Sequence, residues 1–322
     1  MAMKYICRRL VHATLLLVAI SILSFALLQL SPGDYFDAMR MNPQISAQTI
    51  DGIRSEYGLD RPFVVRYEHW LVSVLKGQLG FSIAYNSAVG PLIWVRARNT
   101  LLLTSTATLL AWFLAMPVGM WSAKKRGTWG DRACGVATSA LLTVPDLLLF
   151  LCLLLLAVRT GWFPAGGMMS EGAAPLGFWS KAKDVAFHLL LPCIGLALTI
   201  VPMLVRHIRS AMIEALESPF IRAARGHGIP ETRVLYRYAL PVAANPLISL
   251  MGFSVGTMLS ASVLVEVILS WPGLGPLLVE GIFARDVYVV IGVVMLSSGF
   301  LVAGNLLADL LLLANDPRVR VE

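Results

Sequence analysis

Residues 214–241, EALESPFIRAARGHGIPETRVLYRYALP, form a polar stretch between two long apolar segments, 188–205 and 241–269. An apolar helix of about 20 residues is long enough to cross the ~30 Å hydrocarbon core of a bilayer. The stretch between the two segments is rich in arginine, and glycines flank His227. We therefore interpret residues 214–241 as an exposed connection between two membrane helices, which a partner protein grips to move them.

The composition of the whole chain indicates a helical membrane protein. Hydrophobic residues make up 57% of the 322 residues and charged residues only 14%, whereas roughly a quarter of an average soluble domain is charged. The apolar residues occur in unbroken runs and not in the short alternating segments of a transmembrane β-barrel. The sequence therefore predicts an all-α membrane protein with a single domain, residues 1–322.

Six apolar segments give the predicted transmembrane helices. They are 10–30, 99–123, 133–158, 188–205, 241–269 and 287–314. The first could be a signal peptide, but it is long enough to span and lacks a small-x-small cleavage site, so we expect a retained helix. Residues 31–98 form an external region, with a short helix at 46–58 and an amphipathic helix at 62–76 on the membrane surface. Residues 206–240 form a cytoplasmic coupling loop.

The basic residues predict the orientation. Cytoplasmic loops carry an excess of Lys and Arg. The segments assigned to the cytoplasm hold Lys4, Arg8, Arg9, Lys124, Lys125, Arg126, Arg132, Arg206, Arg209, Arg222, Arg225, Arg233, Arg237, Arg318 and Arg320. The two later external loops hold Arg159, Lys181, Lys183 and Arg285. We therefore expect both termini in the cytoplasm, and the net charge of +7 needs no nucleic acid to explain it.

Motifs for catalysis are missing from the sequence. It contains no GxxxxGK[ST] phosphate loop, no HExxH and no GxSxG. We therefore expect that the chain is not an enzyme and that it does not itself bind ATP or another cofactor. The four cysteines are scattered without CxxC spacing, which favours packing over a metal site or disulfides. If the protein does work against a gradient, the energy must then enter from a partner or from an ion.

The polar stretch has the features of a docking element. Ala223 and Ala224 let another protein approach the backbone closely, and Gly228 can adopt a positive φ that ends a short helix. Arg222 and Arg225 lie on one helix face, where they can meet acidic groups. The alternative is an ordinary positively charged cytoplasmic loop.

The same stretch resembles the EAA loop of ATP-binding-cassette importer permeases. That pattern is E-A-A, three residues, G, nine residues and I-x-L-P. The chain matches its spacing with Arg222-Ala223-Ala224, Gly228 and Tyr238-Ala239-Leu240-Pro241. Arg222 replaces Glu and Tyr238 replaces Ile. Arginine at this position is common in the permeases for peptides and nickel.

Further motifs extend the resemblance over nearly the whole chain. They are Pro32-Gly33-Asp34, Tyr57 to Pro62, Gly77 to Ser82, Asn99-Thr100-Leu101, Glu266, Trp271 to Gly275, Arg285-Asp286 and Asp316-Pro317-Arg318. In this order they resemble the first-permease type of the dipeptide/oligopeptide/nickel importer family. The resemblance implies a subunit of a bacterial or archaeal plasma-membrane importer.

The resemblance also implies the partners. A second six-helix permease would complete the translocation pathway within the membrane lipid. Two cytoplasmic ATPase domains, which carry ATP and Mg, would grip the coupling loops. The residues implied in coupling are Arg222, Ala223, Ala224, Arg225, Gly228, Leu240 and Pro241. An extracytoplasmic binding protein would deliver the substrate, either peptide or nickel.

Ionisable residues inside the predicted helices are candidates for the translocation path, because such residues are costly in a membrane. Asp146 lies near the middle of the third predicted helix, and Glu266 lies late in the fifth. For both, a structural role is the alternative, and for Glu266 a role near Trp271 is favoured. We expect Asp309 at the cytoplasmic boundary. An ion-driven secondary transporter that uses Asp146 and Glu266 is the rival function, weakened by the lack of a detectable inverted repeat.

Overall fold

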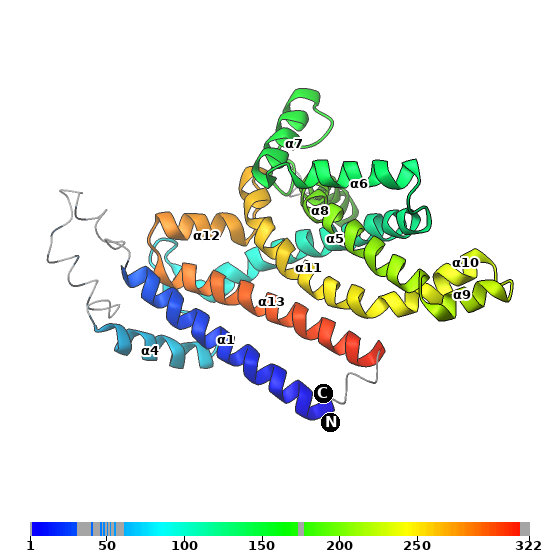
Figure 1. The fold of residues 1–322 in the computed structure, drawn as a ribbon. Helices are drawn as coiled ribbons and strands as arrows, with labels where there is room; N and C mark the ends of the chain where they lie inside the picture. The colour runs from blue at the N-terminus through cyan, green and yellow to red at the C-terminus, as the bar shows by residue number, and fades with distance from the viewer. Residues whose placement is uncertain are drawn as a thin grey trace. The chain divides into compact units, whose positions relative to one another are not determined.

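The structure is a computed structural model that describes residues 2–30, 61–172 and 177–315, with a few single positions between residues 40 and 55. The chain divides into two compact units. Unit 1 contains Thr100–Trp271, the chain from Phe300 onward and Met1–Cys7; unit 2 contains Arg8–Asn99 and Pro272–Gly299. Figure 1 colours the chain from blue at the N-terminus to red at the C-terminus.

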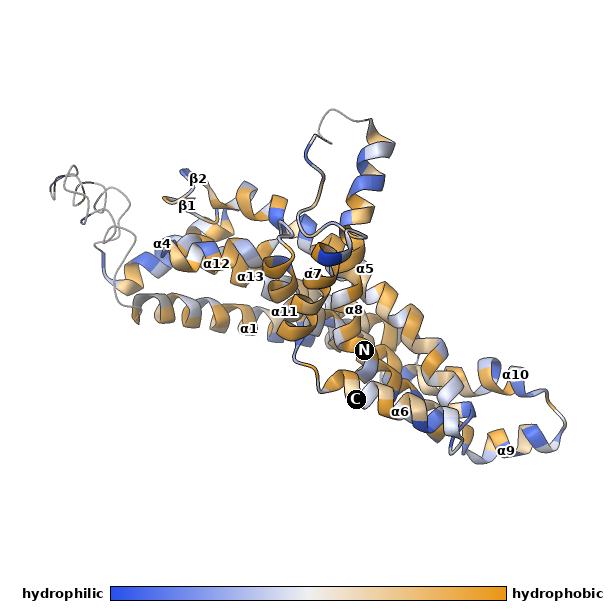
Figure 2. Ribbon diagram, turned by 90° about the horizontal axis from the view of Figure 1, so that it is seen from above, coloured by the Kyte–Doolittle hydropathy of each residue, from blue (hydrophilic) through white to orange (hydrophobic). Residues whose placement is uncertain are grey.

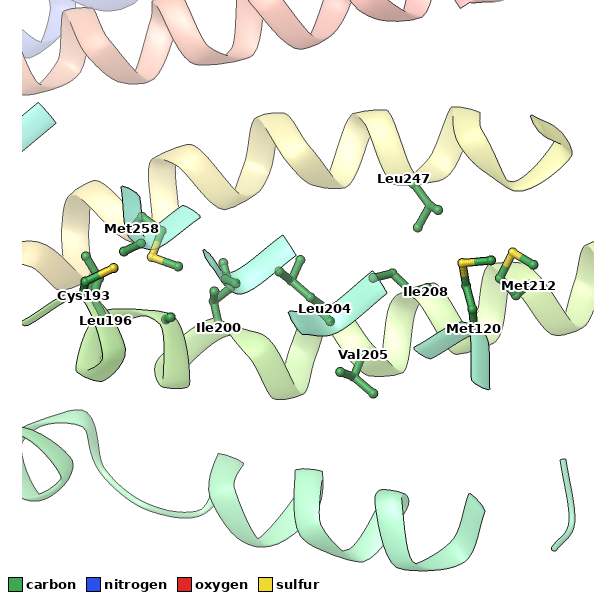
Figure 3. Packing of buried hydrophobic residues seen from close by; sticks show 14 of the residues in the cluster. Met120, Cys193, Leu196, Ile200, Leu204, Val205, Ile208, Met212, Leu247 and Met258 are labelled. Carbon is green, nitrogen blue, oxygen red and sulfur yellow. The ribbon is translucent and has the colours of Figure 1, made fainter. Parts of the chain in front are cut away.

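Unit 1 is built around helix α8 (Phe178–Leu216). The buried side chains Leu196, Leu204 and Ile208 of α8 are each 0% exposed. Figure 3 shows α8 between α11 and α6, with Val205 pointing toward α6. The helices that pack on α8 are the end of α5 (Val89–Lys124), α6 (Trp129–Leu142), α7 (Asp146–Thr160) and α11 (Leu240–Ile268). The end of α13 (Val287–Asn315) packs on α11. An apolar helix that is buried on several sides forms the core of this unit.

The third predicted helix, 133–158, is broken in two. Helices α6 and α7 are separated by Thr143, Val144 and Pro145 and bend by 94° at this break. Proline disfavours helical geometry in the residue before it and cannot donate a backbone hydrogen bond. The prediction of one continuous helix was therefore wrong, and Asp146 is the first residue of α7.

Glycines allow α11 and α13 to approach closely within unit 1. A Cβ atom added at Gly252 would lie 2.5 Å from the Cβ of Ala308, and one at Gly304 would lie 2.8 Å from a methyl group of Val255. Small residues at such positions permit close backbone contact between helices, which is how membrane helices commonly pack.

Among its described residues, unit 2 contains a small hairpin and three helices besides the beginnings of α5 and α13. They are α1 (Ala2–Leu30), α4 (Phe63–Leu75), strands β1 (Phe81–Ser82) and β2 (Ser87–Ala88), which pair antiparallel, and α12 (Leu274–Phe283). Helix α4 is the predicted amphipathic helix, but its apolar face packs on Phe25 of α1 and Ile291 of α13. The amphipathic helix is confirmed, whereas its position on the membrane surface stays a prediction. The predicted helix at 46–58 lies almost entirely outside the described residues.

The described helices agree with a multi-pass membrane protein. Within the part of the chain that the structure describes, five helices are long and apolar enough to cross a membrane, or six if the bent pair α6 and α7 counts as one span. Several begin earlier or end later than the apolar runs: α5 starts at Val89 and α8 continues to Leu216. A helix can continue past the end of its apolar run, because its backbone hydrogen bonds do not depend on apolar side chains, so the apolar run alone does not give the helix ends.

Candidate coupling site

The polar stretch between α8 and α11 forms a helical projection at one end of unit 1. It contains α9 (Pro219–Gly226), α10 (Glu231–Arg233) and a π-helical turn, η1 (Val234–Ala239), which continues into α11. Figures 1 and 2 show α9 and α10 together at the tip, where hydrophilic colours replace the orange of the long helices. The predicted loop 206–240 therefore starts too early, because residues 206–216 belong to α8.

Local sequence signals fix both ends of α9. Pro219 occupies the first helical turn, where its missing N–H has no intrahelical partner anyway. At the other end, the N–H of Gly228 donates to the carbonyl of Arg225 at 3.0 Å, and the N–H of Ile229 donates to that of Ala224 at 3.3 Å. Gly228 has a φ of +74°. This is the Schellman arrangement with glycine in the left-handed position, so the predicted role of Gly228 as a helix end is confirmed.

Helix α9 has an inner face and an outer face. Ile221 is 0% exposed and Ala224 is 8% exposed, and Ile221 belongs to the core cluster that also contains Leu216 and Val234. Ala224 was expected to face a partner together with Ala223, and this was wrong: three residues along a helix bring it to the same side as Ile221. Ala223 is exposed, as expected.

The outer face of α9 carries an aromatic residue that the sequence reasoning missed. Phe220 is 45% exposed. Ala223 and His227 follow it at spacings of three and seven, and both are exposed, so the three residues lie along one side of the helix. An apolar residue two positions before Arg222 in a polar stretch was the signal that could have identified it.

The two arginines of α9 differ in their surroundings. Arg225 binds Glu231 of α10 through two hydrogen bonds, Nε to Oε2 at 3.2 Å and Nη2 to Oε1 at 2.8 Å. Arg222 is exposed. Leu240 is partly buried against the core cluster, and Pro241 is exposed at the start of α11. Arg225 therefore has an acidic partner within its own chain, while Arg222 presents its charge outward.

The connection between α5 and α6 is tied to α8 by a buried carboxylate. Asp131 is 6% exposed and accepts hydrogen bonds from Nε of Arg209 at 2.7 Å and from its Nη2 at 2.8 Å. Ser122 Oγ and the N–H of Gly127 also donate to Asp131, at 2.6 Å and 2.9 Å. A second ion pair joins Arg126 to Glu217. These contacts hold the α5–α6 connection against the end of α8 that leads into α9.

The two predicted pathway carboxylates lie in different settings. Asp146 is partly exposed in the first turn of α7, where a negative charge is favourable to the helix dipole. Glu266 is 0% exposed in α11, and its backbone carbonyl accepts a hydrogen bond from the N–H of Trp271 at 2.8 Å. A pathway role for either residue stays a prediction, and the burial of Glu266 is what its structural alternative expects.

Three further ionisable residues of the long helices have ordinary local surroundings. His188 is 6% exposed, and its Nδ1 lies 2.9 Å from the backbone carbonyl of Asp184. His207 is exposed near the end of α8, and Asp309 is partly exposed in α13. Each of these settings is ordinary for a structural residue.

Two pairs of motifs meet within unit 2. Ser82 Oγ donates to Asp286 at 2.6 Å, although the two residues are 204 positions apart, and the side-chain nitrogen of Asn99 donates to the carbonyl of Pro272 at 2.8 Å. Next to the first pair, Tyr85 donates to the carboxylate of Glu280. Burial and this carboxylate raise the pKa of Tyr85 to about 12. The motifs that are distant in sequence therefore fasten the hairpin region to the ends of α12 and α13.

Unit 1 also holds a cavity of about 400 Å³ between α5, α11 and α13. Three hydroxyl side chains of α5 line it, Thr104, Ser105 and Thr108. Each hydroxyl donates to a backbone carbonyl one turn earlier, so its oxygen presents lone pairs to the cavity.

Family comparisons agree with this architecture. Residues 115–321 match the model of the binding-protein-dependent transport system inner membrane component, and residues 2–91 match the N-terminal model of the membrane components of such systems. The chain belongs to this family. It is a multi-pass inner-membrane protein and the permease subunit of an ATP-binding-cassette importer.

Relatives match over their full lengths. The oligopeptide transport system permease protein AppB of Bacillus subtilis is 36% identical over 317 residues, which are 98% of each chain. A putative peptide permease protein of Brucella ovis is 33% identical, and the oligopeptide transport system permease protein OppB of Mycobacterium tuberculosis is 30% identical, each over 99% of both chains.

A solved structure supports the fold. A chain of the methionine ABC transporter MetNI, in an inward-facing conformation, superposes with a TM-score of 0.58 at 17% identity. The match covers 70% of this permease and 96% of that chain. At this identity, the similarity supports the fold alone.

Proposed function

We propose that this permease forms half of the translocation pathway of an importer for peptides and that it couples to a cytoplasmic ATPase through residues 214–241. The relatives named as peptide or oligopeptide permeases support the substrate class. Nickel is the alternative substrate, because the sequence resemblance extends to nickel permeases.

The observation that carries the coupling proposal is the form of α9. It is a short helix that projects from unit 1, ends in a fixed left-handed turn at Gly228 and exposes Phe220, Ala223 and His227 along one side. An amphipathic helix of this kind can lay its exposed face into a groove of another protein. Its inner face packs on the same core cluster as α8, so a force on α9 acts directly on the membrane helices.

The remaining partners follow from the type of system. A second six-helix permease completes the pathway, two ATPase domains bind ATP with Mg, and an extracytoplasmic binding protein delivers the peptide. Each ATPase state would have to bind the two permease conformations with different affinity, because a ligand shifts an equilibrium only by its differential affinity. The chain itself supplies no nucleotide site in this scheme.

For the pathway itself, we propose that Asp146 and the hydroxyl-lined cavity beside α5 contribute to its wall. Peptides offer backbone N–H donors, which hydroxyl and carboxylate oxygens accept. The break between α6 and α7 supports this role for Asp146, because irregular backbone at membrane depth is tolerated where it is buried or lines a water-filled cavity.

For orientation, we propose that both termini and the connections at Gly127 and Ser218 face the cytoplasm. Reporter tags at these two positions should be accessible from the cytoplasm, and a tag at Gly172 should be accessible from outside. Accessibility of Ser218 from outside would contradict the coupling proposal.

Transport by the reconstituted importer tests the function. Proteoliposomes that contain this permease with its co-purified partner subunits should take up a labelled peptide only with ATP and the binding protein present. Ionophores that collapse ion gradients should leave uptake unchanged. Uptake that follows an ion gradient without ATP would favour the secondary transporter, and ATP-dependent uptake of nickel without peptide would favour the metal importer.

A further inference from the structure

A groove of about 800 Å³ lies between α6 and α8 in unit 1. It extends along α6 from Arg132 to Thr143, and its α8 side includes Val205 and Arg206. The position of Val205 on the side of α8 that faces α6 is visible in Figure 3. This groove is separate from the outer face of α9.

The length of the groove matches one leaflet of a bilayer. From Arg132 to Thr143, the residue that caps α6, the chain advances eleven helical steps, or about 17 Å at the usual rise per residue. Half of the ~30 Å hydrocarbon core is about 15 Å. A groove of this length accommodates an acyl chain that runs from the membrane surface toward the midplane.

The charge of the groove lies at one end. Arg209 also lines it but is neutralised by Asp131. Arg132 and Arg206 are both exposed, and within the described residues neither forms an ion pair. Two uncompensated positive charges therefore stand at the end of the groove that leads to the α5–α6 connection.

The walls beyond this charged end are largely apolar. Val136, which lines the groove, is 70% exposed on α6. Trp129 lies outside the groove, three residues before Arg132 on the same helix, and is 83% exposed. Tryptophan is typical of the membrane–water interface. The groove thus combines a cationic end with a mostly apolar length, which complements the anionic headgroup and the apolar acyl chain of a phospholipid.

We propose that this groove binds an anionic phospholipid of the cytoplasmic leaflet. The phosphodiester contacts Arg132 and Arg206, and one acyl chain lies along α6 from Val136 to Thr143. Arginine suits phosphate because its planar guanidinium donates two parallel hydrogen bonds. Basic pockets between membrane helices bind anionic headgroups in this way. The choice of leaflet rests on the proposed orientation, whereas the lipid class rests on the groove.

A free phosphate or a protein segment fits the groove less well. A phosphate ion would use only the arginine end and leave Val136 exposed. A helix of a partner protein would need carboxylates opposite both arginines to avoid burying unpaired charge. A bound lipid satisfies both ends of the groove and lies beside the Asp131–Arg209 pair, so we expect it to hold α6 against α8.

Lipid binding by the complete, delipidated importer complex tests the proposal. Phosphatidylglycerol and phosphatidylcholine with the same acyl chains are added separately, and glycerol phosphate serves as the headgroup without a tail. Bound lipid is counted by native mass spectrometry, and stability is followed by thermal unfolding. Phosphatidylglycerol should remain bound and raise the unfolding temperature, while the other two should do neither.

Paired variants locate the site. Arg132→Gln with Arg206→Gln should weaken phosphatidylglycerol binding by about tenfold or more. Lys124→Gln with Lys125→Gln removes the same charge from the same end of the protein outside the groove and should leave binding unchanged. Equal binding of the two lipids, equal protection by glycerol phosphate, or unchanged binding in the arginine variant would each overturn the proposal. These readouts need no transport, so they are independent of the coupling proposal.

Discussion

The two polar connections of unit 1, one between α5 and α6 and one between α8 and α11, are alike in composition and opposite in construction. Both are basic, and both contain a glycine with a positive φ, +79° at Gly127 and +74° at Gly228. The first connection turns its acidic group inward, because Asp131 is buried and bound by Arg209. The second projects a helix whose outer face is exposed.

The difference shows that a basic connection is not by itself a docking element. In the α5–α6 connection, the hydrogen bonds of Asp131 fasten the backbone to α8. In the α8–α11 connection, a Schellman turn and the Arg225–Glu231 pair shape a helix without covering its outer face. An excess of positive charge is typical of cytoplasmic loops and is common to both connections, whereas the exposed outer face of α9, where we propose that the ATPase docks, belongs to the second.

The largest expected effect comes from the two matched glycines. An added Cβ meets no atom within 4 Å at either Gly127 or Gly228, so a substitution at either costs mainly the left-handed conformation, about 1 kcal/mol. Gly228→Trp should abolish stimulation of ATP hydrolysis by the loaded binding protein, because the bulky side chain stands where the ATPase docks. Gly127→Trp should keep most of the stimulation.

Two additional variants separate strain from obstruction. Gly228→Asn tolerates the left-handed conformation and should retain more stimulation than Gly228→Trp. Gly226→Trp adds the same bulk within α9, where no positive φ is required. If Gly127→Trp and Gly228→Trp lost the stimulation of ATP hydrolysis to the same extent, the two connections would not differ in coupling.

The next effect concerns the stability of the fastened connection. Asp131→Ala leaves Arg209 without its buried partner and should lower the free energy of unfolding by about 3 kcal/mol. Glu217→Ala removes the partner of Arg126 from an exposed pair, with side chains 54% and 64% exposed, and should cost less than about 1 kcal/mol. Thermal unfolding of the purified complex measures both. Similar losses in the two variants would mean that burial of Asp131 adds no stability.

A smaller effect compares two exposed aromatic residues. Phe220 lies on the outer face of α9, and Trp129 lies at the start of α6 with greater exposure. Aromatic residues at the centre of an interface commonly contribute about 1–2 kcal/mol or more. Phe220→Ala should weaken ATPase binding by about tenfold, measured by pull-down or surface plasmon resonance, whereas Trp129→Ala should leave it unchanged. Weaker ATPase binding in Trp129→Ala, with unchanged binding in Phe220→Ala, would mean that the ATPase docks at the α5–α6 connection and not on α9.

The smallest effect concerns the ion pair within the projecting helices. Arg225 and Glu231 are each about 40% exposed, so a double-mutant cycle of Arg225→Gln and Glu231→Gln should give a coupling free energy below about 1 kcal/mol. High salt should reduce it further. A coupling of several kcal/mol would mean that the pair is desolvated in the complex and belongs to the ATPase interface.

The sequence predicts the helical class, most of the apolar helices and the end of α9 at Gly228, because these depend on local composition and on one glycine. It does not predict the contact between Asp131 and Arg209, which are 78 positions apart and are joined only by the packing of α6 on α8. The inward side of Ala224 depends on where the core lies. The break before Asp146 was signalled by Pro145, but the surrounding run of leucines favoured a continuous helix.

Cross-linking from the outer face of α9 tests the central claim most directly. In a chain whose four cysteines are replaced by alanine, Ala223→Cys and Lys125→Cys are each labelled with a thiol-specific photo-cross-linker in the reconstituted importer. Both positions are exposed, and each lies in one of the two connections. We expect Ala223→Cys to cross-link to the ATPase subunit and Lys125→Cys not to do so. A cross-link from Lys125→Cys without one from Ala223→Cys would contradict the claim.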